Sequence, residues 1–244
     1  MKKVIGLLSF LLVIGSLNAQ TSGQVAQYTP GVGGETDGLY LNAMGSIADK
    51  LDKLDYTDDT IEGSPYQSNT FAPGQLFYGD ENVGEIFYRY NAYNEEIEIK
   101  QKNTEIEPIR GLGKDKKIRL VANGKSMSFK TFVDKRGNTK NGYMTLVSDG
   151  EYKLYKHLKV TFKEAKKAEN SLVKGSPARF SQSTVYYLES PDGKRLDEVQ
   201  LNNKKLLELV DKSKQEDLKQ YLKENKIKVN DVNDLNKVVN FLNG

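Results

Sequence analysis

The sequence predicts a mainly β protein of the α+β class: an antiparallel β-meander of about nine strands that forms a sandwich or barrel, with a short N-terminal helix and a small C-terminal helical bundle. Two observations lead to this fold class. Between about residues 75 and 200, apolar and polar residues alternate with a period of two, which is typical of strands, and turn signals separate the runs. Past Leu201 the apolar spacing becomes helical.

The chain begins with the pattern of a secretory signal peptide, which we assign to residues 1–19. Lys2 and Lys3 precede the apolar run Val4–Gly15, and the small residue Ala19 marks the cleavage site. A membrane anchor is the alternative, but a helix of this length spans about 18 Å, whereas a bilayer core is about 30 Å thick. We therefore expect export to the periplasm, the cell surface or the medium. We expect no transmembrane segment in the mature chain.

Three further segments precede and follow the expected strands. Residues 20–37 are rich in Gly, Ser, Thr and Gln and predict a flexible leader. Residues 38–64 predict a short amphipathic helix over Leu39–Leu54, followed by an acidic loop. Residues 65–201 are the expected β domain, and residues 202–244 the helical appendage.

Apolar and β-branched runs indicate the individual strands. We expect strands at Gln75–Tyr78, Glu85–Tyr90, Glu96–Lys100, Ile118–Val121, Met127–Val133, Tyr143–Ser148, Tyr152–Phe162, Thr184–Glu189 and Arg195–Leu201. Asn123-Gly124, Asp149-Gly150 and the four residues from Ser190 to Gly193 predict three hairpin turns. Strands joined by such turns are antiparallel neighbours.

The C-terminal segment predicts three short helices. The first carries Leu206 to Val210, and the second opens with Ser213 and Glu216 in the spacing of a capping box. Asn230 or Asp231 is expected to cap the last helix. Helices this short are marginal alone in water, so we expect them to pack on one another or on the sheet.

Composition excludes several kinds of chemistry. The 244 residues contain no Cys, which excludes disulfides and Cys-ligated zinc, and His157 is the only histidine. Strand alternation predicts His157 on a solvated, basic face, away from any acid partner. No pattern indicates a catalytic, cofactor-binding or metal site, and enzyme status stays open, with the balance against it.

Three residue patterns are candidates for functional sites. Carboxylates for glycoside cleavage are available at Glu95, Glu96, Glu98, Glu105 and Glu107. Tyrosines that could line a groove for a sugar or a peptide are Tyr88, Tyr90, Tyr93, Tyr186 and Tyr187. Acidic residues that invite a calcium site are Asp49, Asp52, Asp55, Asp58 and Asp59, but they lack the spacing of an EF-hand loop. For the carboxylates we favour a solvated strand face, and for the tyrosines a role as strand formers.

Charge is uneven along the chain. Residues 20–99 carry 3 basic and 14 acidic groups, whereas residues 100–174 carry 19 basic and 8 acidic groups. The basic middle either attracts a polyanion such as lipopolysaccharide or pairs with acidic strands beside it. The formal net charge of +3 is too small to indicate a nucleic-acid partner.

The stretch Arg89–Glu98 reads RYNAYNEEIE and resembles a motif of uncharacterised secreted or periplasmic proteins of Bacteroidetes. Phe71, Pro73 and Gly74 before it, and Tyr186 to Leu188 after it, are also similar to members of that family. The family has no assigned activity, so the resemblance implies a cell-envelope location and assigns no site residues.

Together these features favour a non-enzymatic binding or structural module of the cell envelope, with another envelope protein or a glycan as partner. The first alternative is a carboxylate-dependent glycan hydrolase, and a weaker one is a lipopolysaccharide binder. No cofactor is expected, and the oligomeric state stays open.

Overall fold

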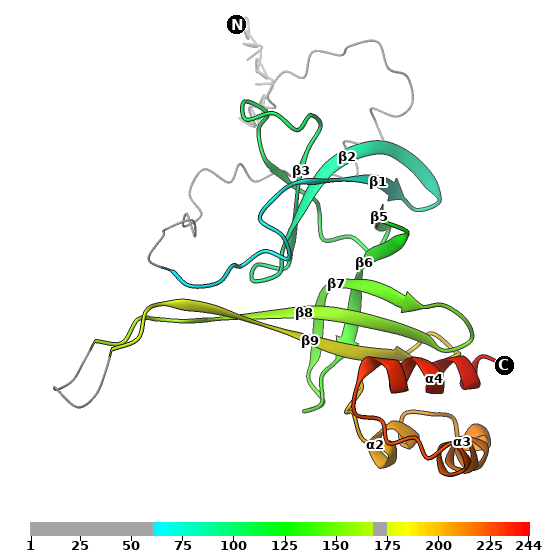
Figure 1. Cartoon of the computed structure of the whole chain (residues 1–244). Helices are drawn as coiled ribbons and strands as arrows, with labels where there is room; N and C mark the ends of the chain where they lie inside the picture. Colours follow the sequence, from blue (N-terminus) through cyan, green and yellow to red (C-terminus); the bar gives the residue numbers. More distant parts are fainter. Residues whose placement is uncertain (1–60, 168–174) are drawn as a thin grey trace, which may run out of the picture. The chain divides into compact units, whose positions relative to one another are not determined.

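The computed structural model describes residues 61–167 and 175–244 (Figure 1). The predicted signal peptide, leader and amphipathic helix, and the candidate calcium aspartates, lie outside these residues. Within them the chain is mainly β, with one sheet of ten strands and three C-terminal helices, which confirms the predicted fold class. The strands are β1 Ala72–Tyr78, β2 Glu81–Asn91, β3 Glu96–Lys100, β4 Arg110–Gly111, β5 Ile118–Ala122, β6 Lys125–Val133, β7 Thr139–Ser148, β8 Lys153–Lys163, β9 Arg179–Glu189 and β10 Leu196–Glu198.

The sheet departs from a simple meander at β1. Strands β5 to β10 lie side by side in chain order, as predicted, but β5 pairs with β1 rather than with β4. The two-residue strand β4 is too short to produce a sequence signal. Strand β9 begins at Arg179, five residues before its predicted start, and β10 stops at Glu198.

The hairpin between β5 and β6 turns at Asn123 and Gly124, whose φ angles of 50° and 71° fit the type I′ turn that their sequence favours. The hairpin between β7 and β8 has a longer loop. Gly150 adopts a φ of 153° there, and a Cβ atom on it would clash with the side-chain amide of Asn243. This amide bonds both backbone groups of Tyr152, at 2.7 and 3.0 Å, and so fastens the C-terminal helix to the sheet.

Five strands close into a ring. β6 to β10 follow one another, and β10 returns to pair in parallel with β6 at Asp197 and Val133. One buried cluster belongs to the strands of this ring and consists of Phe132, Met144, Tyr155, Tyr187 and Leu196. We call it the ring core.

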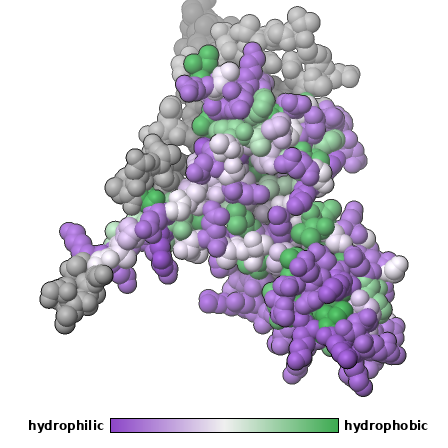
Figure 2. All heavy atoms as spheres, viewed as in Figure 1, coloured by the Kyte–Doolittle hydropathy of each residue, from purple (hydrophilic) through white to green (hydrophobic). Residues whose placement is uncertain are grey.

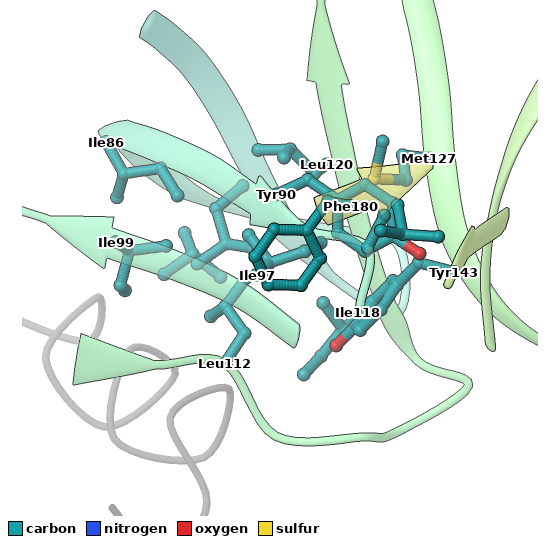
Figure 3. Close-up of a cluster of buried hydrophobic side chains, with 14 residues drawn as sticks. Ile86, Tyr90, Ile97, Ile99, Leu112, Ile118, Leu120, Met127, Tyr143 and Phe180 are labelled. Carbon is teal, nitrogen blue, oxygen red and sulfur yellow. The ribbon is translucent and has the colours of Figure 1, made fainter. Parts of the chain in front are cut away.

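A second core joins β1–β5 to the second half of β8 and the first half of β9. Figure 3 shows the packed side chains of this cluster, among them Ile97, Leu120, Tyr143 and Phe180. A segment over residues 61–67, which we call the strap, bridges β9 to β2 through backbone hydrogen bonds. Phe180 N–H donates to Glu62 at 2.8 Å, and Ala92 N–H donates to Pro65 at 2.9 Å.

Three helices cover another part of the sheet: α2 Asn203–Leu207, α3 Lys212–Glu224 and α4 Val232–Leu242. Their leucine and valine faces form one core with Tyr152, Leu154 and Leu188. On the face shown in Figure 2, hydrophilic residues surround small, separate hydrophobic patches. Across the described ranges, no helix combines the length and the apolar character needed to cross a membrane.

The sequence predicts the N-cap of α4 correctly and the N-cap of α3 wrongly. Asp231 caps α4 by accepting the N–H of Asp234 at 2.9 Å, as expected. The capping box at Ser213 is wrong, because α3 begins at Lys212 and Asp211 occupies the cap position. Ser213 therefore lies inside the first turn, where its hydroxyl cannot act as the N-cap.

Burial raises the pKa of Tyr90, Tyr143, Tyr155 and Tyr187 above the ordinary value of 10.0. Since the unfolded chain ionises these phenols at lower pH than the folded chain, their contribution to stability is complete below pH 10 and is lost as the pH rises further. We expect phenolate absorbance from these four residues to appear only together with loss of the β-sheet circular dichroism signal. Titration of all tyrosines near pH 10 with the fold intact would contradict the packing described.

Candidate functional site

His157 is buried rather than on a solvated face, which corrects the prediction. Its exposed fraction is 7%, and its ring lies 5.2 Å from that of Phe132 and 6.3 Å from that of Tyr187. The alternation of residues along the strand gave the wrong prediction because both faces of β8 are covered by other parts of the protein over this stretch. Tyr155 and His157 face the ring core, whereas Leu154 faces the helices.

An acid partner for His157 comes from the turn between β2 and β3. Glu95 Oε1 lies 2.5 Å from His157 Nε2, and Glu95 Oε2 accepts the hydroxyl of Tyr90 at 2.6 Å and the N–H of Tyr143 at 3.1 Å. An ionised carboxylate only accepts hydrogen bonds, so this contact is a hydrogen bond to ionised Glu95 in the tautomer that has a proton on Nε2. Glu95 and His157 are 62 positions apart in the sequence, so no local pattern signals their pairing.

Glu95 fills a break in the sheet. β7 and β8 pair only from Thr145 to Ser148, and nearer the start of β7 the two strands part. The N–H of Tyr143 therefore bonds the Glu95 carboxylate instead of a strand. Gly142 permits this approach, since a Cβ atom on it would lie 2.8 Å from Oε2. Glu95 itself has a φ of 52°, a left-handed conformation that is uncommon for a non-glycine residue.

The Glu95–His157 pair lines a groove of about 720 Å³. The carboxylates that line this groove already accept hydrogen bonds from the protein. Asp134 accepts the N–H groups of Arg136 and Asn138, each at 2.9 Å, and these bonds together with Lys140 hold the pKa of Asp134 well below its usual range. Glu198 accepts the N–H of Lys135 at 3.0 Å. The groove therefore presents structural carboxylates rather than an evident acid–base pair.

The other candidate carboxylates are not brought together either. Glu98 is 3% exposed and receives two hydrogen bonds from Arg89, so the solvated-face prediction is wrong for it. Glu96 lies against Gly111, where a Cβ atom would be 2.6 Å from its carboxylate. Glu105 and Glu107 belong to the loop between β3 and β4.

The candidate tyrosines contribute to three different cores. Tyr88 and Tyr90 pack in the core of β1–β5, Tyr186 packs with the helices and Tyr187 in the ring core. Tyr93 is exposed and contacts the ring of Phe180. They therefore do not line a common groove. No group of three acidic or histidine side chains suited to a metal is found among the residues that the structure describes.

A different groove, of about 900 Å³, lies along an open stretch of β6. One edge of β6 is paired by β7. The other edge pairs with β5 up to Ser128 and with β10 at Val133. Over residues 129–132 no described strand pairs with this second edge. The ring thus closes with a four-residue gap, and we call the hollow over it the basic groove.

Cationic side chains surround the basic groove from both sides of the gap. They are Lys116, Lys117, Arg119, Lys130, Lys153, Lys194 and Arg195, against the two carboxylates Asp80 and Glu189. On the β10 side, Lys194 pairs with the exposed Asp192 at 3.4 Å, and such a pair is weak and leaves the lysine available to a ligand. Arg195 donates two hydrogen bonds to Asp197, from Nε at 3.0 Å and from Nη2 at 2.6 Å, so much of its charge is offset.

The β5 side is less neutralised. In the described part of the chain no carboxylate lies within ion-pair distance of Lys116, Lys117 or Arg119. The Arg119 guanidinium lies 4.0 Å from the ring centroid of Phe77, a cation–π contact that orients it. Among the described residues, this side therefore carries an excess of positive charge.

The floor of the groove is an ordered polar cluster. Glu189 Oε1 accepts Lys130 Nζ at 3.4 Å, and Glu189 Oε2 accepts the hydroxyl of Tyr155 at 3.0 Å. Lys130 Nζ also lies 4.9 Å from the ring centroid of Tyr155. Burial, followed by the neighbouring Glu189 charge, raises the pKa of Tyr155. The basic middle of the sequence indicates this charge, but the groove itself is lined by residues from separate segments between Gly79 and Leu196.

The Glu95→Gln substitution tests the role of the carboxylate in the break between β7 and β8. An amide presents only one oxygen, so at least one of the Tyr90, Tyr143 and His157 donors loses its acceptor. Leaving a buried donor unsatisfied costs about 1–3 kcal/mol, and we expect the free energy of unfolding in urea to fall by that amount. The exposed Glu105→Gln variant is the control. Equal unfolding midpoints for the two variants would contradict this role.

No protein-family model, curated protein or solved structure matches the chain. The resemblance of Arg89–Glu98 to a Bacteroidetes family therefore stays a prediction from the sequence.

Proposed function

We propose that the chain is a non-enzymatic binding module that holds an anionic glycan in the basic groove. The observation that carries the proposal is the gap in the second edge of β6, which has cations on both sides and a polar floor. A concave surface of one charge sign concentrates ligands of the opposite sign and accelerates their association.

The floor suits a saccharide better than a bare ion. Ser126, Ser128 and Glu189 all line the groove. Sugar hydroxyls can donate to or accept from the serine hydroxyls, and they can donate to the carboxylate. A glycan would therefore find both charge and hydroxyl complementarity.

The cellular setting rests on the sequence. The signal-peptide pattern of residues 1–19 and the resemblance of Arg89–Glu98 both favour the cell envelope, where acidic polysaccharide and lipopolysaccharide are present. Within this proposal, lipopolysaccharide is one member of the anionic glycan class. The hydrolase alternative is less favoured, because Glu95, Glu98 and Asp134 are each bound by several donors.

Neutralising the β5 side tests the proposal. We expect the triple variant Lys116→Gln, Lys117→Gln, Arg119→Gln to bind polygalacturonate at least tenfold more weakly than the parent chain, since each lost charge removes attraction. The parent affinity should fall as salt rises, because exposed charges are screened, and the variant should show a weaker salt dependence. Isothermal titration calorimetry at several salt concentrations measures both.

A control triple variant, Lys212→Gln, Lys223→Gln, Lys228→Gln, removes the same charge from exposed positions of the helical segment. It should bind nearly as well as the parent chain, and neutral dextran should not bind at all. Equal losses in the two triple variants, or binding that salt does not change, would overturn the proposed function.

A further inference from the structure

We infer that another hollow of the sheet binds a small anion that has an apolar body and one acid group. The hollow has a volume of about 550 Å³, which is within the range of small-molecule sites. We call it the lysine pocket, after Lys125 and Lys156 in its lining. This inference is independent of the glycan proposed for the basic groove.

The lysine pocket lies where β6 and β7 part. These two strands are paired as far as Met127 and Thr145, and the pairing stops there, short of Lys125 at the start of β6. On the other edge of β7, the register with β8 shifts between Leu146 and Ser148. Such an irregularity bends a strand and changes the direction of its side chains. The end of β7 is therefore free of regular pairing on both edges, which leaves room for a cavity.

Much of the wall of the lysine pocket is apolar. Leu146, Val147, Tyr186 and Val232 line it, and Val232 is the first residue of α4. The side chain of Val147 belongs to a residue that is 36% exposed. A ligand with an apolar body would cover this surface and remove it from water, which favours binding.

Two cations of the lysine pocket have no acidic partner. Lys156 is half-buried and Lys125 is exposed, and within the described ranges no carboxylate lies within ion-pair distance of either. The carboxylate in the lining, Asp149, pairs instead with Lys153 at 3.2 Å. Burial, followed by the positive charge of Lys125, lowers the pKa of Lys156. An acid group bound to both ammonium groups would offset their mutual repulsion.

The lysine pocket therefore offers charge for an acid group and apolar surface for the rest of the ligand. Its volume suits a drug-sized molecule rather than a polymer, which distinguishes this ligand from a glycan. Ser126 and Leu146 line both the lysine pocket and the basic groove. A test must therefore report where the ligand binds as well as how tightly.

An NMR titration of the backbone amides with 2-naphthoate, a carboxylate on two fused aromatic rings, tests the inference. We expect the largest shift changes over residues 124–126 and at Val147. Acetate lacks the apolar body and 2-naphthalenemethanol lacks the acid group, so each should bind weaker by about tenfold or more. Equal affinity for 2-naphthalenemethanol, shift changes confined to residues 129–132, or no binding of 2-naphthoate would overturn the inference.

The double variant Lys125→Gln, Lys156→Gln isolates the two cations. It should bind 2-naphthoate about tenfold more weakly than the parent chain and 2-naphthalenemethanol equally well. The control Lys212→Gln, Lys223→Gln removes the same charge from exposed positions of α3 and should keep the parent affinity. Equal affinities of the two double variants for 2-naphthoate would overturn the inference. If the first variant unfolds, the comparison of 2-naphthoate with 2-naphthalenemethanol in the parent chain still decides it.

Discussion

The fold depends on how one carboxylate completes the sheet where β7 and β8 part. Glu95 accepts the N–H of Tyr143 that would otherwise lack an acceptor, and it also binds Tyr90 and His157. A buried N–H without an acceptor is costly, so this residue allows the strands to diverge. Because the two strands diverge, the first half of β8 packs in the ring core and its second half packs in the core of β1–β5.

The RYNAYNEEIE stretch thus has a structural explanation. Arg89 lies between the rings of Tyr66 and Phe71 and bonds Glu98, which ties the strap to β2 and β3. Glu95 ties the same hairpin to β7 and β8. The basic groove is formed elsewhere, by a ring that closes through β10 and leaves part of the β6 edge without a strand. The residues that hold the fold together and those of the proposed glycan site are therefore largely separate.

Local signals account for what the sequence predicted. Turn residues such as Asn123-Gly124 and the helical spacing of the C-terminal leucines act over a few residues, and the strands and helices near them were found. The pairing of β1 with β5, the return of β10 to β6 and the contact of Glu95 with His157 join residues far apart in the chain. The burial of His157 follows from those contacts, so strand alternation alone placed it wrongly. The basic groove was missed for the same reason.

Glycan binding in the basic groove is tested most directly by locating a bound acidic oligosaccharide through NMR chemical-shift changes in the backbone amides. We expect the largest changes over residues 129–132 of β6, with further changes near Arg119 and Arg195 on either side of the gap. Changes confined to the groove beside Glu95 and His157, or to the helices, would contradict it.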